Sequence, residues 1–588
     1  MKLAVIGNCA YQALIDDCAR IKWLCWPRFD SSFVFGELLD ERYGGEFSIA
    51  PADQEFTSAQ AYLPLTNILR TEITSASGRF EVLDWAPRFK QYERMYKPTS
   101  LFRRVRPLDG KPMIRVRCRP VYDYGATVPI HYTSSNHIGW TLADAQLRLT
   151  TNAPLTYVSE GRPFALATDT YLALTWGRPL DADLLETAET YLARTRRYWK
   201  TWSQHANLPA RYQDEVMRSA LILKLHQFED TGAITAATTT SLPEYPGSGR
   251  TWDYRYCWLR DSYFTLRALV QLGQFEEMDR FISYLINIAS NYPERLQPVY
   301  AINGQAQLEE RTLDHLAGYL DNGPVRAGNM AFEQQQHDVY GEMLAAIAPV
   351  FTDIRFRDRA DAWHTDVLSQ LLSHIEQHIE SPDAGLWEKR QAPALHTFSL
   401  LMHWAGATAA QHVGLAQRST ELEDRGRELA ERARELIESR CWRPKLGYYA
   451  DTVDSAHTDA SLFLMVNLGY LPGDSANAAS HVDGLAKALS ANDHLLYRYL
   501  HHDGIGDTHA TFTVCGFWYA EALARIGRTD DAERVFTQLL SYANHAGLLS
   551  EDIDPQTGRL WGNIPQTYSH VGIINTAFAL SPLSSPIL

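Results

Sequence analysis

Aromatic and charged side chains are concentrated in residues 250–261, which read RTWDYRYCWLRD. A sugar-binding pocket needs flat aromatic faces against the pyranose ring, and fixed carboxylate and guanidinium groups that hydrogen-bond its hydroxyls. Trp252, Trp258, Arg260 and Asp261 supply this combination within one short segment. The structural alternative is that Asp261 caps the helix predicted to follow, paired with Arg260, and that the indoles lie in the core.

A second polar group opens the helix predicted from residue 338. Gln336, Asp338 and Glu342 lie at its start, where the helix dipole favours acidic side chains. Capping therefore explains them as well as a binding site does, and Gln336 and Asp338 remain candidate substrate-binding residues. His337 is interpreted as structural, because no partner three or four residues away completes a metal site.

A glycine-broken loop carries Glu388 directly after Trp387. A carboxylic acid beside an indole, in a pocket that excludes water, suits a general acid. This makes Glu388 a candidate catalytic residue. The alternative is an exposed glutamate on a turn, ion-paired with Lys389 or Arg390.

A further acidic group, Ser550-Glu551-Asp552, follows a predicted helix C-terminus, whose dipole repels acids. A carboxylate that activates water is one reason to place acids there, and a solvated acidic turn is the alternative. Glu388 and Glu551 are 163 positions apart, and nothing in the periodicity brings them together.

The first 178 residues must supply a β-rich domain. Segments such as 66–73, 80–85, 113–118 and 171–176 are rich in β-branched and aromatic residues and are separated by turn residues. This pattern predicts an antiparallel β-sandwich over residues 1–178.

From residue 181 the apolar pattern changes to a period near 3.6, which is typical of helices. A connecting helix is predicted over 181–204, within a linker at 179–208. The later helices are predicted near 210–227, 261–272, 275–291, 338–349, 359–379, 396–411, 420–438, 459–468, 481–489, 512–526, 530–545 and 569–579. Their number favours an (α/α)6 barrel over residues 209–588. An open helical-repeat array is the alternative, disfavoured because no repeated sequence unit is visible.

The composition excludes several classes of function. The 588 residues carry a formal charge of -15, which disfavours nucleic acid as a partner. No window is apolar enough for a membrane span, and no signal-peptide stretch opens the chain. The seven cysteines are scattered without metal-type spacing, so reduced thiols are expected. A soluble cytoplasmic protein is the expectation.

The chain resembles glycoside hydrolase family 15, the glucoamylase-like enzymes. The resemblance rests on strings in the same order along the chain: TTSLPE at 239–244, WDYRYCWLRD at 252–261, DVYGE at 338–342, GLWEKR at 385–390 and GLLSED at 547–552. It implies a β-sandwich followed by an (α/α)6 barrel, in agreement with the periodicity.

By matching position, the resemblance implies that Glu388 is the general acid and Glu551 the general base of an inverting hydrolysis. Their carboxyl groups are then expected roughly 6.5–9.5 Å apart, to leave room for the attacking water. Trp258, Arg260 and Asp261 are implied to bind the terminal glucose. Lys389 follows the acid where fungal glucoamylases have a glutamate that contacts the next sugar, so Lys389 and Trp387 are candidates for substrate contact. No metal or organic cofactor is implied.

The leading hypothesis is an exo-acting inverting α-glucoside hydrolase that releases β-D-glucose from the non-reducing end of short α-glucans or α-glucosyl oligosaccharides. The main alternative is a trehalase, or an enzyme specific for isomaltose or another disaccharide, within the same family. A disaccharide phosphorylase is disfavoured because Glu551 occupies its motif, and a non-catalytic sugar-binding protein because both carboxylates are present. The expected partner is an α-glucoside, and a homo-oligomer stays open.

Overall fold

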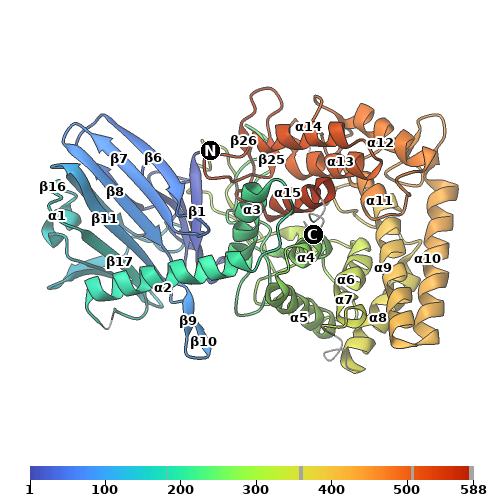
Figure 1. The fold of residues 1–588 in the computed structure, drawn as a ribbon, viewed down its shortest axis with the longest axis horizontal. Helices are drawn as coiled ribbons and strands as arrows, with labels where there is room; N and C mark the ends of the chain where they lie inside the picture. The colour runs from blue at the N-terminus through green and yellow to red at the C-terminus, as the bar shows by residue number, and fades with distance from the viewer. Residues whose placement is uncertain (181, 357–361, 505–508, 582–588) are drawn as a thin grey trace, which may run out of the picture.

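The computed structural model describes residues 1–180, 182–356, 362–504 and 509–581. It has a β-rich N-terminal part and a helical C-terminal region, with the long helix α2 running from one toward the other (Figure 1). This division agrees with the change of apolar period in the sequence. Residue 181 and residues 359–361, which belong to two predicted helices, lie outside the described residues.

The N-terminal part consists mainly of two antiparallel sheets. One sheet has the order β1-β2-β3-β5-β12-β16, with β4 paired to β3, and the other has the order β13-β14-β15-β17-β11-β8-β7-β6. The strands of the first are β1 (Leu3–Gly7), β2 (Gln12–Asp16), β3 (Arg20–Cys25), β4 (Phe33–Phe35), β5 (Glu46–Pro51), β12 (Met113–Arg119) and β16 (Phe164–Ala165). Those of the second are β6 (Phe56–Tyr62), β7 (Leu69–Ser75), β8 (Gly78–Trp85), β11 (Ser100–Gly110), β13 (Ile130–Thr133), β14 (His137–Thr141), β15 (Gln146–Thr151) and β17 (Thr170–Trp176).

Alternation of apolar and polar residues explains how these sheets bury one face. Along β7 every second residue from Leu69 to Ile73 is buried while the residues between them are partly exposed. Buried side chains of both sheets, such as Val5 and Val105, belong to one hydrophobic cluster. The four strand segments predicted from the sequence overlap β7, β8, β12 and β17.

Helix α2 (Leu184–Gln204) connects the two parts. Its N-cap is Asp183, whose side chain accepts a hydrogen bond from the backbone N–H of Glu186. It contacts β17 along the sheets and buries Trp199 and Trp202 at its C-terminal end. The predicted connecting helix is confirmed.

Six helical elements of the C-terminal region form a series of contacts that returns to its start. The order is α4–α6–α9–η3/α11–α13–α15–α4. These elements are α4 (Arg260–Gln271), α6 (Asp338–Ile347), α9 (Thr397–Gln417), the 3-10 turn η3 (Ala460–Phe463) with α11 (Leu464–Asn467), α13 (Thr513–Arg525) and α15 (Thr567–Leu580). The sequence predicts one helix over 459–468, where the structure has a 3-10 turn followed by a short α-helix.

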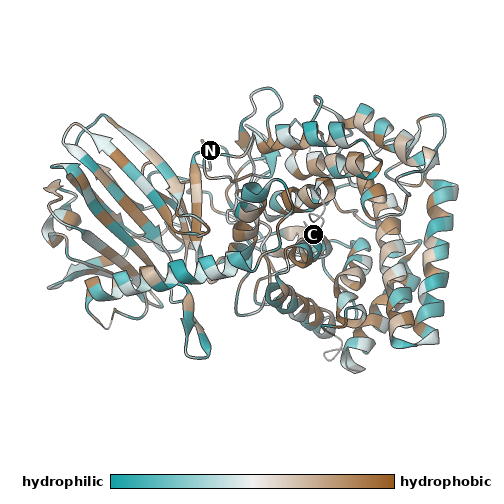
Figure 2. Cartoon of the chain, in the orientation of Figure 1, coloured by the Kyte–Doolittle hydropathy of each residue, from teal (hydrophilic) through white to brown (hydrophobic). Residues whose placement is uncertain are grey.

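Further helices pack around this series. They are α3 (Gln213–His226), α5 (Phe275–Asn291), α8 (Ala362–His378), α10 (Thr420–Arg440), α12 (Ala476–Leu489) and α14 (Thr529–Leu540). One helix of each set shows a clear contrast in hydropathy: α10 has many hydrophilic residues, whereas α15 is apolar and almost wholly buried (Figure 2). None of the helices in the described residues is long and apolar enough to cross a bilayer.

Candidate active site

A cavity of about 440 Å³ lies in the helical region, within the size range of roughly 300–1,000 Å³ typical of small-molecule sites. Aromatic residues and ionisable residues together make up most of its lining. The aromatic residues are Trp252, Tyr254, Trp258, Trp387, Phe512, Trp518 and Tyr568. The ionisable residues other than Tyr254 and Tyr568 are Glu244, Arg250, Arg260, Asp261, Glu310, Glu333, Glu388, Arg390 and Arg498.

Most of the predicted site residues converge on this cavity. Trp252, Trp258, Arg260, Asp261, Trp387 and Glu388 line it. Gln336, Asp338, Lys389 and Glu551 are not among the lining residues, and each has a defined place behind the wall. Hydrogen bonds connect some of the lining residues to the residues behind them.

Glu388 is held by the segment that carries most of the predicted binding residues. The indole N–H of Trp258 donates to Glu388 Oε1 at 2.7 Å, and Arg260 Nη1 lies 3.6 Å from the same oxygen. Because Oε1 faces these two donors, the other carboxyl oxygen, Oε2, is the one that can carry a proton. The Glu388 side chain is 26% exposed, so it is open to a ligand in the cavity.

Arg260 and Asp261 form the first turn of α4. Asp261 makes no capping bond, in contrast to the structural alternative, and its carboxylate lies 3.4 Å from Arg260 Nε. Burial raises the pKa of Asp261 to about 6, and the charge of Arg260 opposes this shift. The two side chains thus present a carboxylate and a guanidinium to the cavity side by side, the arrangement that suits sugar hydroxyls.

Glu551 lies behind Tyr254, outside the set of residues that line the cavity, and is 1% exposed. The phenol O–H of Tyr254 donates to Glu551 Oε1 at 2.6 Å, and Tyr254 itself lines the cavity. The backbone N–H of Glu551 donates to the carbonyl of Asn563. A β-carbon at Gly562 would lie 2.7 Å from Cβ of Glu551, so the close approach requires glycine at that position.

The two candidate catalytic carboxyl groups are linked through one aromatic pair. The rings of Tyr254 and Trp258 meet edge to face with centroids 5.2 Å apart. One ring donates to Glu551 and the other to Glu388. The structure therefore brings these distant residues to one site.

The environment of Glu551 is acidic. Burial raises the pKa of Glu551 to about 8, the charge of Glu244 adds to the shift, and Arg498 opposes it. Burial and the same two glutamates also raise the pKa of Asp552, whose carboxyl oxygens have no hydrogen-bond partner. Glu551 is consequently expected to keep its proton until the pH approaches about 8.

Asp338 and Glu342 lie behind Arg260, in the interior. Both are fully buried, and their carboxyl oxygens have no hydrogen-bond partner. Burial raises the pKa of Asp338 to about 7, with a further contribution from Asp383, while Arg260 lowers it. Asp338 therefore acts on Arg260 through charge and does not line the cavity.

Gln336 is also one step removed from the cavity. Its amide Nε2 donates to Oε1 of Gln334 at 3.2 Å. Gln334 lines the cavity and donates to the backbone carbonyl of Glu388 at 3.3 Å. Gln336 thus supports a neighbour of the candidate acid.

The β-rich part helps to hold the segment that contains Tyr254 and Trp258, the donors to Glu551 and Glu388. Arg255 lies between Tyr254 and Trp258 in sequence and is fully buried. It pairs with Asp253 at 2.7 Å and donates to the carbonyl of Ser31 and to the hydroxyl of Tyr124, both in the N-terminal part. The N-terminal part therefore helps to fix the wall of the cavity.

Several lining residues were not predicted as site residues. Tyr254 and Glu244 belong to the strings that resemble family 15, so the sequence identified their segments. It did not assign a role to either residue. Arg498 and Trp518 stand outside those strings, and no local pattern identifies them. Their place in the site depends on how the helical elements come together.

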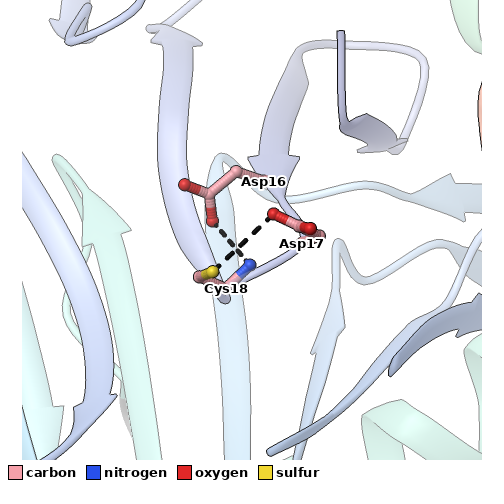
Figure 3. Close-up of side chains that lie close together, drawn as sticks. All are labelled: Asp16, Asp17 and Cys18. Carbon is pink, nitrogen blue, oxygen red and sulfur yellow. Dashed lines mark hydrogen bonds between the residues drawn. The ribbon is translucent and has the colours of Figure 1, made fainter. Parts of the chain in front are cut away.

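Within the described residues, one group has side chains spaced as metal ligands: Asp16, Asp17 and Cys18 (Figure 3). The backbone N–H and the thiol of Cys18 hydrogen-bond to Asp16 and Asp17, and Asp17 pairs with Lys2. Burial and the two aspartates raise the pKa of Cys18 to about 11, so the thiol stays neutral. These contacts explain why the three side chains lie close together: they belong to the turn between β2 and β3 and hydrogen-bond within it.

A cavity walled by aromatic residues, guanidinium groups and carboxyl groups is of the kind that suits a carbohydrate ligand. The model of glycosyl hydrolases family 15 matches residues 210–578, and that of the trehalase-like N-terminal domain matches residues 1–175. The chain belongs to glycosyl hydrolase family 15.

Curated relatives span nearly the whole chain. A trehalase of Mycobacterium tuberculosis is 33% identical, covering 97% of this chain and 88% of the relative. A trehalase of Thermoplasma volcanium is 30% identical, with coverages of 97% and 92%. Among solved structures, a bacterial glucoamylase in complex with acarbose has a TM-score of 0.71 at 14% identity, covering 98% of this chain and 93% of that one. This last likeness concerns the fold.

Proposed function

We propose that the protein is an inverting α-glucoside hydrolase whose preferred substrate is trehalose, the α,α-1,1-linked disaccharide of glucose. The observation that carries the choice of substrate is the likeness to trehalases over 97% of the chain. This favours the trehalase alternative over the hydrolysis of short α-glucans. Short α-1,4-glucans remain the second candidate and form a separate arm of the test.

The proposal includes the architecture. The helices are assigned to an (α/α)6 barrel, with the series from α4 through α15 inside and α3, α5, α8, α10, α12 and α14 outside. The contacts of the helical region support this assignment. The β-rich domain is assigned to residues 1–178, the linker to 179–208 and the catalytic domain to 209–588.

The terminal glucose is assigned to the inner end of the cavity. Arg260 and Asp261 are placed to bind its hydroxyls, and Trp258 to contact the ring. The second glucose is assigned to the more open side, where Arg390 lies over the Trp252 indole at 5.1 Å. Trp387 contributes to the wall beside the acid.

In the proposed reaction Glu388 donates the proton on Oε2 to the glycosidic oxygen as the bond to the anomeric carbon breaks. Ionised Glu551 takes a proton from a water that attacks this carbon from the opposite face, and Tyr254 orients the Glu551 carboxylate. The configuration inverts at the attacked carbon. The other glucose leaves with its own anomeric bond intact.

This stereochemistry provides a direct test by proton NMR. Trehalose should initially give β-glucose and α-glucose in equal amounts, because only one of its two α-anomeric carbons is attacked. Maltose, isomaltose, kojibiose, nigerose and maltooligosaccharides are compared at the same concentration. Higher kcat/KM on maltooligosaccharides than on trehalose would transfer the assignment to the second candidate. Initial release of α-glucose alone would exclude inversion.

A phosphorolytic reaction is tested in the same assay. Inorganic phosphate should leave the products unchanged, with no glucose phosphate formed. Formation of a sugar phosphate in place of one glucose would replace the hydrolase proposal.

A further inference from the structure

Lys389 directly follows the proposed general acid, yet its side chain points away from the cavity. Its side chain is 7% exposed, and Nζ lies 3.3 Å from Asp451 Oδ2. The ammonium group also lies over the ring of Tyr499, 5.2 Å from its centroid. The charge of Lys389 is thus held in the interior, out of reach of a ligand in the cavity.

Asp451 is a fixed partner for this charge. Its side chain is 4% exposed, and its backbone carbonyl accepts from the N–H of Thr397, the first residue of α9. Burial alone would raise the pKa of Asp451, but Lys389, Ser455 and His501 together lower it. The carboxylate therefore stays ionised, and the ion pair links the Glu388 loop to α9.

The backbone of the loop needs such a link. Glu388 has a φ of 56°, in the left-handed region that side chains other than glycine rarely adopt. Trp387, Glu388 and Arg390 line the cavity, whereas Lys389 between them does not. The backbone N–H of Arg390 donates to the carbonyl of Asp503 at 3.0 Å. The side chain of Lys389 is therefore a further anchor of this loop, in addition to the hydrogen bonds that Trp258 and Gln334 donate to Glu388 itself.

We propose that the buried Lys389–Asp451 ion pair positions the carboxyl group of Glu388 for proton donation. Lys389 is then a positioning residue, in place of the substrate contact expected from the sequence. The inference rests on the proposed function, because it takes Glu388 to be the acid. It goes beyond that function by assigning a role to two residues that do not touch the substrate.

The test compares substrates that differ in their need for a proton. A sugar leaving group requires protonation of the glycosidic oxygen, whereas fluoride departs with little help, so α-glucosyl fluoride reports on the site without the acid. Lys389→Met should lower kcat on trehalose by about 10- to 100-fold, with KM within about threefold. Hydrolysis of α-glucosyl fluoride should fall by less than about threefold.

Two controls separate positioning from other causes. Lys224→Met removes the ammonium of a comparable buried ion pair, Lys224–Glu277 at 3.0 Å, whose lysine and glutamate side chains are 3% and 5% exposed. Any loss in this variant should be equal on both substrates. Glu388→Gln should show the same selective loss on trehalose as Lys389→Met, and to a larger extent.

A folding defect is separated by a charge-free double variant. If Lys389→Met does not fold, Lys389→Met/Asp451→Leu is measured in its place, because it removes both charges of the ion pair together. Equal losses on the two substrates, or a raised KM with unchanged kcat, would overturn the positioning role. The wild-type protein is assayed first with all the α-glucosides: no turnover on any of them overturns the proposed function and this inference together. If the wild-type protein hydrolyses an α-glucoside but the Lys389 variant loses activity equally on trehalose and on α-glucosyl fluoride, only the positioning role is overturned.

Discussion

Glu388 lines the cavity whereas Glu551 lies behind Tyr254 in its wall, and the surroundings of the two carboxyl groups differ in exposure and in charge. The Glu388 side chain is 26% exposed and faces an indole N–H and a guanidinium. Residue Glu551 is 1% exposed, and Glu244 and Asp552 lie in its electrostatic environment. The comparison leads us to expect that Glu388, the proposed acid, depends on how its loop is held, whereas Glu551, the proposed base, depends on the charges around it.

The largest effect is expected when either carboxyl group is replaced. Glu388→Gln and Glu551→Gln should each lower kcat on trehalose by about 10²- to 10⁴-fold, because each removes a proton-transfer group. The two variants should differ on α-glucosyl fluoride, which needs the base but little of the acid. Steady-state kinetics on both substrates measure this difference.

The exposed glutamate Glu431 on α10 provides the control, since Glu431→Gln should leave both rates unchanged. If Glu551→Gln kept its activity on the fluoride and Glu388→Gln lost it, the two roles would have to be exchanged.

A smaller effect is expected when the donor to the base is removed. Tyr254→Phe deletes the O–H that bonds Glu551 Oε1 and retains the ring that contacts Trp258. Hydrogen bonds to charged groups contribute about 1.5–3 kcal/mol, so kcat should fall by roughly 10- to 100-fold. The fall should be alike on trehalose and on α-glucosyl fluoride.

Tyr256→Phe, two residues along the same segment, is the matched control, because Tyr256 is not among the residues that line the cavity. A selective loss on trehalose in Tyr254→Phe would place the tyrosine with the acid instead.

The smallest effect is a shift in pH dependence. A general base must be ionised, and burial and Glu244 raise the pKa of Glu551 to about 8. Thus kcat/KM should increase with pH between the ordinary glutamate value of 4.5 and about 8. Glu244→Gln removes a like charge and frees Arg498, and both changes lower the pKa of Glu551.

The acidic limb of the kcat/KM profile should therefore move to lower pH in Glu244→Gln, by about one unit. Profiles for the wild-type and variant proteins are measured with the same buffers and ionic strength. A shift of the acidic limb to higher pH would contradict the assigned electrostatics.

Much of the fold could be predicted because local patterns determine it. The period-two pattern around β7 and the helical spacing of the buried residues of α10 identify elements that each bury one face. The break between η3 and α11 could not be predicted, because a turn of 3-10 helix retains similar apolar spacing.

The site was predictable only in part. Trp258, Arg260 and Asp261 lie close together in sequence, so their chemistry was visible before their positions were known. The proximity of Glu388 to Glu551 comes from tertiary contacts that no periodicity encodes. The direction of Lys389 could not be inferred either, because it depends on the left-handed backbone of its neighbour.

The contact between the rings of Tyr254 and Trp258 has a consequence for how such a cavity can diversify. Because Tyr254 and Trp258 lie in one short stretch of chain, a single segment contributes to the positions of both Glu551 and Glu388. Substitutions at the rim, for example at Glu310, Glu333 or Arg390, can alter which sugar is accepted as leaving group.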